Sequence, residues 1–333
     1  MDQIKTYTIN NKSLPLVMEP RNSSMSLEEL LALIHENKSY FKEILRKQGG
    51  LLLRNFPINN IDAFAAIIEA LKLGRFLDYI GGDSPRDKVK GGVYTSTEAP
   101  PSIKIPLHNE LSFVKNYPKH IYFYCGIPPE KAGETIIADA RSVLTTMKKE
   151  VKDRFIAEGI KYISCYYGKS PVMDLLNKYQ RSHKPWKDVF ETEDRIEVEA
   201  KCRQADFAYK WHKDWIQISQ TRPATLLHPE TGEEVWFNQA HLYDFNPKLL
   251  GVWRYLAAKA FYFQPHTRLH EVAFANNSRI PRNDLYTVMD TLDTNTIYFP
   301  WQKNDVMILD NILSMHGRAP FKGKRRVYAA MTG

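Results

Sequence analysis

The sequence is poor in cysteine and contains no long apolar run. Its 333 residues include three cysteines, at positions 125, 165 and 202, whose long and irregular spacing fits neither a zinc motif nor a disulfide framework. We interpret them as free thiols of a reducing compartment. No segment approaches the roughly 18–20 apolar residues that a membrane-spanning helix needs, and residues 1–8 lack the apolar stretch of a signal peptide. We therefore expect a cytoplasmic protein without membrane contact.

Internal repeats, low-complexity tracts and a continuous basic stripe are also missing. The formal net charge is +8, but basic residues are scattered among acidic ones, and the densest cluster is the short run at 322–326. Nucleic-acid-binding proteins present a broader basic stripe, so we expect no nucleic-acid partner. A modest positive balance suits an anionic substrate, cosubstrate or partner.

What is present begins with a predicted helix–strand–helix lead-in over residues 1–90. Ser26 to Glu29 has the form of a capping box, and apolar residues continue at helical spacing to about residue 47. A short apolar strand at 51–56 and a helix at 62–71 follow. No Gly-, Ser- or Pro-rich linker follows these elements, so the lead-in belongs to one domain that spans residues 1–333.

From residue 91 the pattern is mainly β. The sequence predicts strands at 92–96, 105–113, 121–125, 133–138, 215–219, 234–238, 306–309 and 326–330, and helices at 140–158, 192–203, 247–260 and 284–292. Residues 159–211 show no strand signal and are expected to form a lid or substrate-region insertion. Many short strands with Pro/Gly turns and peripheral helices predict a β-sandwich or barrel with helical decoration.

Three His-x-Asp/Glu pairs occur, where about one is expected by chance for 10 histidines and 38 acidic residues. His228 and Glu230 lie in a predicted turn around a proline, and His212 and Asp214 have no obvious third partner. His108 and Glu110 lie in the apolar segment 105–113. On a strand both side chains would point to the same face, which supplies two thirds of the two-His-one-carboxylate set that holds non-haem Fe(II).

The C-terminal segment offers the remaining parts of such a site. His316 follows the predicted strand 306–309 and is the candidate third ligand. Arg326 opens the last strand, where its guanidinium could hold a carboxylate, and Thr135 could add a hydroxyl to the same anion. An iron site beside an anchor for a distal carboxylate suits a 2-oxo dicarboxylic acid.

These motifs resemble those of the TauD/TfdA-type Fe(II)/2-oxoglutarate dioxygenases, in the clavaminate synthase-like branch associated with amino-acid hydroxylation in natural-product pathways. The resemblance covers about residues 49–333 and is carried by residues 107–110, 133–135 with Asp139, 228–232 leading into 236–239, and 310–318 followed by 325–326. It implies a double-stranded β-helix, or jelly-roll, core. It also implies Fe(II) as cofactor, with 2-oxoglutarate and O₂ as cosubstrates.

The resemblance also assigns roles to single residues. His108, Glu110 and His316 match the iron ligands and Thr135 a 2-oxoglutarate contact. Arg326 matches the arginine that holds the distal carboxylate, with Arg325 as the alternative one position earlier. Taurine dioxygenase has a further arginine four residues on, where this chain has Ala330, which argues against taurine as substrate. The related halogenases replace the acid of the triad with a small residue, so Glu110 argues for oxygenation.

The implied reaction is hydroxylation of an unactivated C–H bond of a small amino-acid-like substrate, free or bound to a carrier protein. Desaturation and cyclisation are known variants of the same chemistry. A cupin-type oxygenase without a 2-oxo acid and a non-catalytic β-barrel binding module are the alternatives. Candidate substrate contacts are Asn109, Asn238, Gln239 and Arg318, although a structural hydrogen bond is the favoured role of Asn109 and Arg318 could instead pair with an acid on the surface.

Overall fold

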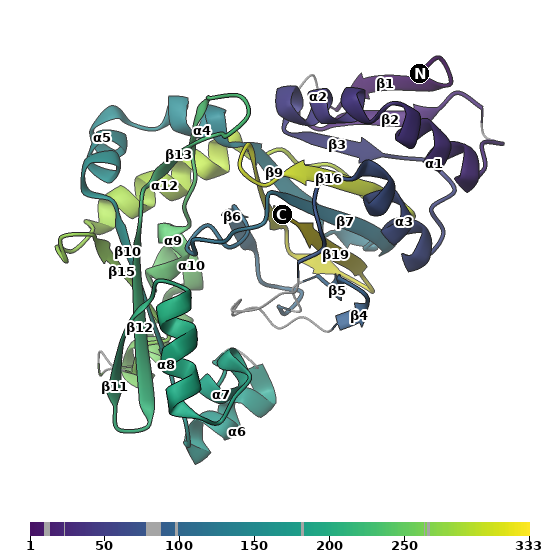
Figure 1. Ribbon diagram of the computed structural model, residues 1–333. Helices are drawn as coiled ribbons and strands as arrows, with labels where there is room; N and C mark the ends of the chain where they lie inside the picture. Colours follow the sequence, from purple (N-terminus) through teal and green to yellow (C-terminus); the bar gives the residue numbers. More distant parts are fainter. Residues whose placement is uncertain are drawn as a thin grey trace.

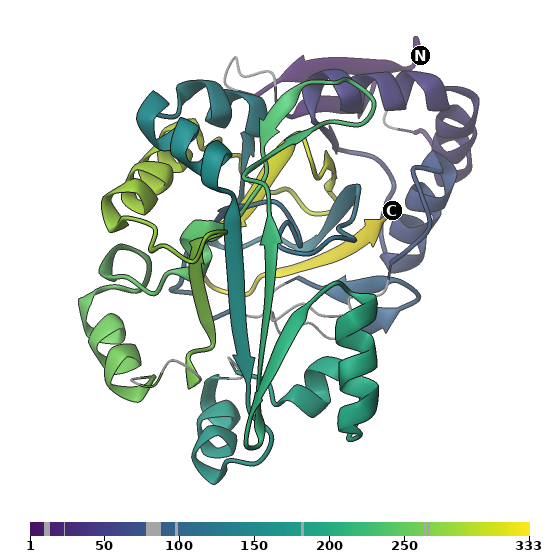
Figure 2. The ribbon, with the colours of Figure 1, turned by 60° about the vertical axis from the view of Figure 1, so that its left-hand side comes forward.

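The fold is organised around β-sheets, and helices pack around two groups of strands (Figure 1). A computed structural model of the chain describes residues 1–9, 14–22, 24–77, 88–96, 99–180, 183–262, 264 and 267–333. One group of strands forms the two facing sheets of a jelly-roll core, and the other forms an arm that extends from it (Figures 1 and 2). The prediction of a mainly β fold with flanking helices is confirmed.

The large sheet of the core has eight strands, and four of them, β1 to β4, come from the lead-in. In spatial order the strands are β1 (Ile4–Thr8), β2 (Leu16–Pro20), β3 (Gly50–Leu53), β16 (Val306–Asp310), β7 (His120–Ile127), β19 (Arg326–Thr332), β5 (Val93–Thr95) and β4 (Lys88–Lys90). All neighbours are antiparallel except β2 and β3. Strands β1 and β2 were not predicted from the sequence. Because they extend the large sheet beyond β3, the lead-in is part of that sheet.

Three helices cover one face of this sheet: α1 (Leu27–Glu36), α2 (Lys38–Gln48) and α3 (Ile61–Leu71). The predicted capping box is confirmed, because Ser26 Oγ accepts from the Glu29 N–H and the Glu29 carboxylate accepts from the Ser26 N–H. The single helix predicted to about residue 47 is interrupted at Asn37, which ends α1. Gly49 ends α2 in the left-handed region (φ 76°), where a Cβ would meet Ser314 Oγ at 2.5 Å.

The small sheet of the core has three strands, β6 (Ile105–His108), β17 (Ser314–Arg318) and β9 (Thr135–Asp139), with β17 in the middle. Its inner face packs against the large sheet: Ile137 of β9 shares a buried cluster with Phe123, Met307 and Val327. The space between the two sheets contains the candidate site.

The outer face of the small sheet packs against a second apolar core. That core is built from α4 (Ala140–Thr146), α5 (Lys149–Glu158), α9 (Ala240–Tyr243), α12 (Arg282–Asn295) and the hairpin β13 (Thr225–Leu227) and β14 (Glu234–Trp236). Ile136 and Ala138 of β9 are fully buried in it. The helix predicted at 140–158 is two helices, because the chain leaves the helical conformation at Met147 and Lys148.

The arm is a four-stranded sheet in the order β11 (Ala208–His212), β12 (Trp215–Arg222), β10 (Ile160–Tyr166) and β15 (His270–Phe274) (Figure 2). Its helices are α6 (Pro171–Gln180), α7 (Trp186–Phe190), α8 (Arg195–Gln204), α10 (Pro247–Leu250) and α11 (Val252–Phe261). The two-residue pairs β8 (Lys131–Ala132) and β18 (Phe321–Lys322) complete the strands. The prediction that 159–211 lacks strands is wrong, because β10 lies within it and β11 begins in it.

The strand predicted at 105–113 is also shorter than expected. It ends at His108, because residues 110–112 turn and Leu111 has a left-handed backbone (φ 54°). Glu110 therefore lies on the turn that follows β6, and the simple strand alternation used to predict its direction does not apply to it.

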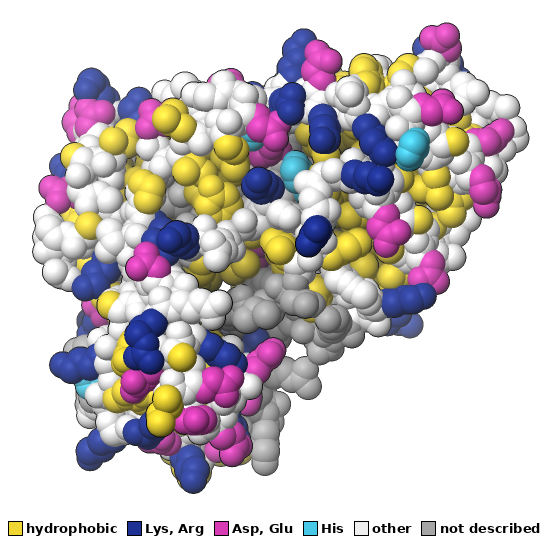
Figure 3. All heavy atoms as spheres, in the orientation of Figure 1, with side chains coloured by type: hydrophobic (Ala, Val, Ile, Leu, Met, Phe, Trp, Pro, Cys, Tyr) yellow, Lys and Arg dark blue, Asp and Glu magenta, His cyan; other side chains and the backbone are white. Residues whose placement is uncertain are grey.

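The surface carries both signs of charge. On the face shown in Figure 3, which is viewed as in Figure 1, lysine and arginine side chains are interspersed with acidic ones rather than gathered into one stripe. Within the described ranges, no helix combines the length and the apolar character needed to cross a membrane.

Candidate metal centre and anion pocket

Two histidines meet across neighbouring strands of the small sheet. His316 of β17 is the direct cross-strand partner of His108 of β6, so both imidazoles leave the same face, and their ring centroids are 4.5 Å apart. Glu110 enters from the turn after β6, with its Oε2 3.4 Å from His316 Nε2. One ligand atom from each residue lies within 4.8 Å of the other two.

This donor set fits a divalent metal. Two imidazoles and one carboxylate are the ligands of non-haem Fe(II) sites that keep open positions. His108 Nδ1 lies 2.9 Å from the Pro106 carbonyl, which can only accept, so Nδ1 carries the proton and Nε2 the lone pair that a metal takes. The His316 ring packs on Phe123, with centroids 5.2 Å apart, which fixes its orientation.

A pair of asparagines holds together the two segments that carry Glu110 and His316. The Asn311 side chain accepts from the Glu110 N–H at 2.7 Å and donates to the Glu110 carbonyl at 3.0 Å. In return, the Asn109 amide donates to the Asn311 carbonyl at 2.7 Å and lies 3.3 Å from the carbonyl of Ser314. Both asparagines are fully buried. This clasp positions Glu110 relative to the loop that leads to His316.

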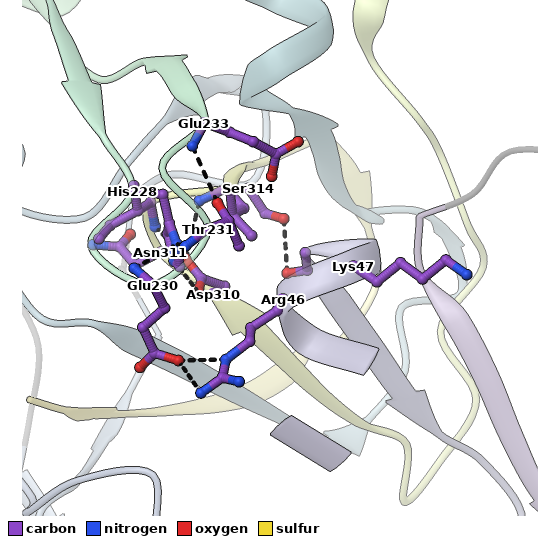
Figure 4. A network of polar contacts seen from close by, with 12 residues as sticks. Arg46, Lys47, His228, Glu230, Thr231, Glu233, Asp310, Asn311 and Ser314 are labelled. Atoms are coloured by element: carbon purple, nitrogen blue, oxygen red, sulfur yellow. Dashed lines mark hydrogen bonds and ion pairs between the residues drawn. The ribbon is translucent and has the colours of Figure 1, made fainter. Parts of the chain in front are cut away.

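The turn at His228 supports the same loop from outside (Figure 4). His228 Nδ1 accepts from the N–H groups of Glu230 and Thr231, so its proton is on Nε2, which donates to Asp310 Oδ2 at 3.0 Å. Asp310 Oδ1 accepts from the Ile312 N–H at 2.8 Å. The His228-x-Glu230 pair is therefore a structural connector in a turn, as its proline and glycine predicted.

The connector also reaches helix α2 (Figure 4). Arg46 forms an ion pair with Glu230, and Ser314 Oγ donates to the Gly49 carbonyl at 2.8 Å. The remaining chance pair, His212 and Asp214, lies at the β11–β12 turn of the arm, where Asp214 accepts from the Lys169 N–H and pairs with an arginine of α8. Neither alternative pair joins the triad.

A small cavity lies beside the triad and carries a basic group. Besides His108 and His316, its lining consists of Ser96, Ile105, Phe123, Thr135, Gly317, Arg318 and Arg325. Thr135 pairs across the strands with Arg318, and its Oγ1 lies 3.2 Å from Trp301 Nε1 and 3.4 Å from Arg325 Nη2. A buried hydroxyl and a guanidinium next to a metal centre can receive a carboxylate.

The structure places Arg325 in this cavity and Arg326 on the exposed surface. Arg325 Nε donates to the Gly133 carbonyl at 2.9 Å and Nη1 lies 3.5 Å from Ser96 Oγ. Burial, together with the nearby charge of Arg318, lowers the pKa of Arg325 to about 10. The cavity beside the triad, where Arg326 was expected, is lined by Arg325 instead, the alternative named in the sequence analysis.

Of the four candidate substrate contacts, only Arg318 lines the cavity beside the triad. Its guanidinium, however, donates to the carbonyls of Ala99, Pro100 and Ile103. The fully buried Asn238 uses its amide to bridge the Ala224 carbonyl and the Ala240 N–H. Gln239 is buried, and its N–H donates to the Tyr162 hydroxyl. Asn109 serves the clasp. The structure brings none of the three amides to the cavity lining.

Several residues of the site escaped the sequence reasoning. Ser96, Phe123 and Trp301 come from loops and strands far from the motifs, and no local pattern marks them as neighbours of the triad. Asn311 was part of a quoted motif, yet its role as a clasp depends on a contact across 201 residues. The one signal in the sequence for this contact was that both motifs contain an asparagine, Asn109 in one and Asn311 in the other.

Comparisons with known proteins agree on the kind of protein. The family model described as "Taurine catabolism dioxygenase TauD, TfdA family" matches residues 10–331. The dapdiamide synthesis protein DdaC of Enterobacter agglomerans is 35% identical over 291 residues, which cover 87% of this chain and 83% of that protein. A clavaminate synthase-like protein of Arabidopsis thaliana is 28% identical, covering 96% of this chain and 94% of that protein.

A solved structure shares the fold. The protein PvcB of Pseudomonas aeruginosa superimposes with a TM-score of 0.57 over 99% of this chain and 91% of its own, at 13% identity. Its structure is described as that of an Fe, alpha-ketoglutarate dependent oxygenase from an isonitrile synthetic pathway.

Proposed function

Because this chain belongs to the TauD/TfdA family of Fe(II)/2-oxoglutarate-dependent dioxygenases, we propose that it hydroxylates an unactivated C–H bond of a small amino-acid or amino-acid-derived substrate. The observation that carries the proposal is the meeting of His108, Glu110 and His316 within 4.8 Å beside a basic cavity. Fe(II) held by these three residues would supply the chemistry by which O₂ oxidises the substrate while 2-oxoglutarate is converted into succinate and CO₂.

We assign the metal to His108, Glu110 and His316. The proton on His108 Nδ1 directs Nε2 toward the metal, and the Asn311 clasp fixes the backbone of Glu110. Since three protein ligands leave open positions on Fe(II), 2-oxoglutarate and O₂ can share the site.

We assign the distal carboxylate of 2-oxoglutarate to Arg325 and Thr135. Arg325 is a partly buried cation without an ion-pair partner among the described residues, and Thr135 Oγ1 lies beside it. The further arginine of taurine dioxygenase would then correspond to Ala329 instead of Ala330. Both positions are alanine, so the argument against taurine is unchanged.

We further propose a role in natural-product biosynthesis, with the substrate free or tethered to a carrier protein. The naming of the bacterial relative for dapdiamide synthesis supports this. The arm, including residues 159–211, is proposed to help select the substrate, because Tyr162 of β10 packs on Phe113, three residues after Glu110. We expect the reaction to take place in the cytoplasm, where the three buried cysteines stay reduced.

The deciding experiment is anaerobic addition of Fe(II) and 2-oxoglutarate to the protein. The chelate is expected to give a weak visible charge-transfer band, which should be lost in Glu110→Ala. Admission of air with a panel of amino acids should then give substrate-stimulated succinate. Absence of both the band and succinate would refute the proposal. A band with no stimulation by any free amino acid would direct the search to carrier-bound substrates.

A further inference from the structure

A second and larger cavity lies away from the triad, between α11, β15 and the start of α12. Its volume is about 650 Å³, within the range of small-molecule sites. It shares no lining residue with the cavity beside the triad. It lies on the outer side of the small sheet, because its wall residue Tyr243 belongs to α9, which packs in the outer core.

The floor of this cavity is apolar and its rim is basic. Tyr243, Val272, Ile280 and Leu285 are buried at the floor. Lys259 and Arg279 are exposed at the rim. A ligand would therefore insert an apolar end and leave an ionised group near the surface.

The charges of the lining leave a positive surplus. Arg268 pairs with Glu271 at 3.1 Å, and Arg282 lies 3.7 Å from Asp244. These pairs neutralise the two acids of the lining. Among the described residues, no carboxylate lies within ion-pairing distance of the other two lining cations, Lys259 and Arg279. Two uncompensated cations at one opening attract an anion.

Helix α11 needs a partner on its inner face. Tyr255, Ala258, Lys259 and Tyr262 line the cavity, and their spacing puts them on one face of the helix. No side chain of α11 is fully buried, although helices in proteins gain most of their stability from packing an apolar face. The aromatic rings of this face therefore lie over a space that a ligand can fill.

We propose that this cavity is a second binding site for a small organic anion, with a flat or apolar body and a carboxylate, sulfonate or phosphate group. The body packs between Tyr255, Tyr262 and the floor, while Lys259 and Arg279 hold the anionic group. The site is independent of the metal and of 2-oxoglutarate, so a negative result for this site would leave the proposed reaction unaffected. Through Tyr243, which packs on Phe113 with ring centroids 5.5 Å apart, an occupant lies one side chain away from the turn that carries Glu110.

The probe is 8-anilinonaphthalene-1-sulfonate, a flat aromatic sulfonate whose fluorescence rises on binding. We expect saturable 1:1 binding to the protein loaded with Mn(II) and 2-oxoglutarate. The variant Lys259→Glu/Arg279→Glu should weaken binding about tenfold. The control Arg254→Glu/Lys303→Glu changes the net charge equally at exposed positions outside the cavity, and it should bind as the parent does.

A second pair of variants tests the position of the ligand. Ala258→Trp fills the cavity from α11 and should abolish binding, whereas Ala257→Trp adds the same bulk to the exposed side of the helix and should not. Near-ultraviolet circular dichroism checks that each variant is folded. Equal binding by Ala258→Trp and Ala257→Trp would overturn the proposal, as would displacement of the probe by excess 2-oxoglutarate.

Discussion

Arg325 is a cation in a setting that disfavours its charge. Its nitrogens reach a backbone carbonyl and two hydroxyls, none of which carries a negative charge. Burial and the charge of Arg318 accordingly lower its pKa to about 10. A carboxylate placed against it would recover part of that desolvation cost, and this is the physical reason to expect anion binding here.

Replacing Arg325 with alanine should raise the apparent dissociation constant for 2-oxoglutarate by about 10- to 100-fold, the value of one or two hydrogen bonds to a charged group. Titration of the charge-transfer band under anaerobic conditions measures this constant. Arg326→Ala is the matched control and should change it less than about twofold, because that side chain is exposed. If Arg326→Ala raised the dissociation constant more than Arg325→Ala does, Arg326 would be the residue that binds the distal carboxylate.

The choice between the two arginines could not be made from the sequence. Val327, Ala329 and Met331 face the interior between the sheets, while Tyr328 and Ala330 face the helices. Both sets are apolar because both faces of β19 are covered, so alternation does not reveal which face holds the site. The ladder with β7 is also irregular between Arg326 and Val327. The proposed assignment of His108 and His316, in contrast, rests on their residue types and motifs alone.

At the scale of elements, the loop between β16 and β17 determines the position of His316, the proposed third ligand. It is held by Asn311 on the inside and by His228 through Asp310 on the outside. Four N–H or C=O groups around the ligands are satisfied by asparagine side chains in place of strand ladders. Buried side-chain amides of this kind are costly to leave unpaired.

We expect Asn311→Ala to weaken Fe(II) or Mn(II) binding by about 10- to 100-fold, as removal of residues that orient metal ligands commonly does. The control is Asn238→Ala, which removes an equally buried amide that also bonds only backbone groups. Both variants should lose stability, but only Asn311→Ala should lose metal affinity in an isothermal titration. Loss of substrate turnover in Asn238→Ala at unchanged stability would instead support a substrate role for Asn238.

Elements encoded by local signals were predicted best. The capping box at Ser26 and the helix at 62–71 depend on residues a few positions apart, and both were confirmed. Strand β10 was missed because it mixes lysine and serine with its apolar residues, so it becomes apparent only as the partner of β12 and β15. The turn at Glu110 likewise results from the long-range contact with Asn311.

For the whole molecule, metal binding should add stability, because the three ligands come together only in the folded state. Mn(II) at 100 times its dissociation constant should raise the free energy of unfolding by about 2.7 kcal/mol. Thermal melts followed by circular dichroism measure the shift. Glu110→Ala should abolish it, whereas a melt of this variant that still rises with Mn(II) would locate the metal elsewhere.

Acid should destabilise the fold through buried neutral histidines. His241 Nε2 donates to the Leu107 carbonyl at 3.0 Å, and burial lowers its pKa to about 4. The unfolded chain, with a histidine pKa near 6.5, binds the proton first, so stability falls as the pH drops from 6.5 toward 4. Between pH 7 and 5 this group should contribute about 2 kcal/mol of that loss.

The matching variant is His241→Gln, whose amide can still donate to the Leu107 carbonyl. Urea unfolding at pH 7 and pH 5 should show a pH-dependent loss smaller than in the parent by about 2 kcal/mol. The exposed His35→Gln should leave the loss as it is. An unchanged loss in His241→Gln would mean that the imidazole is already protonated in the folded protein.

The direct pairing of His108 with His316 has a consequence for how this chain can change in length. Since strand side chains alternate with a period of two, deleting one residue between Asn311 and His316 would turn the imidazole away from its partner. Segment 311–316 is therefore expected to tolerate no insertion or deletion. The β11–β12 turn at the tip of the arm sets no such register for the triad, so new segments grafted there should leave iron binding intact. Diversification among relatives, and deliberate engineering, would be expected to use the arm.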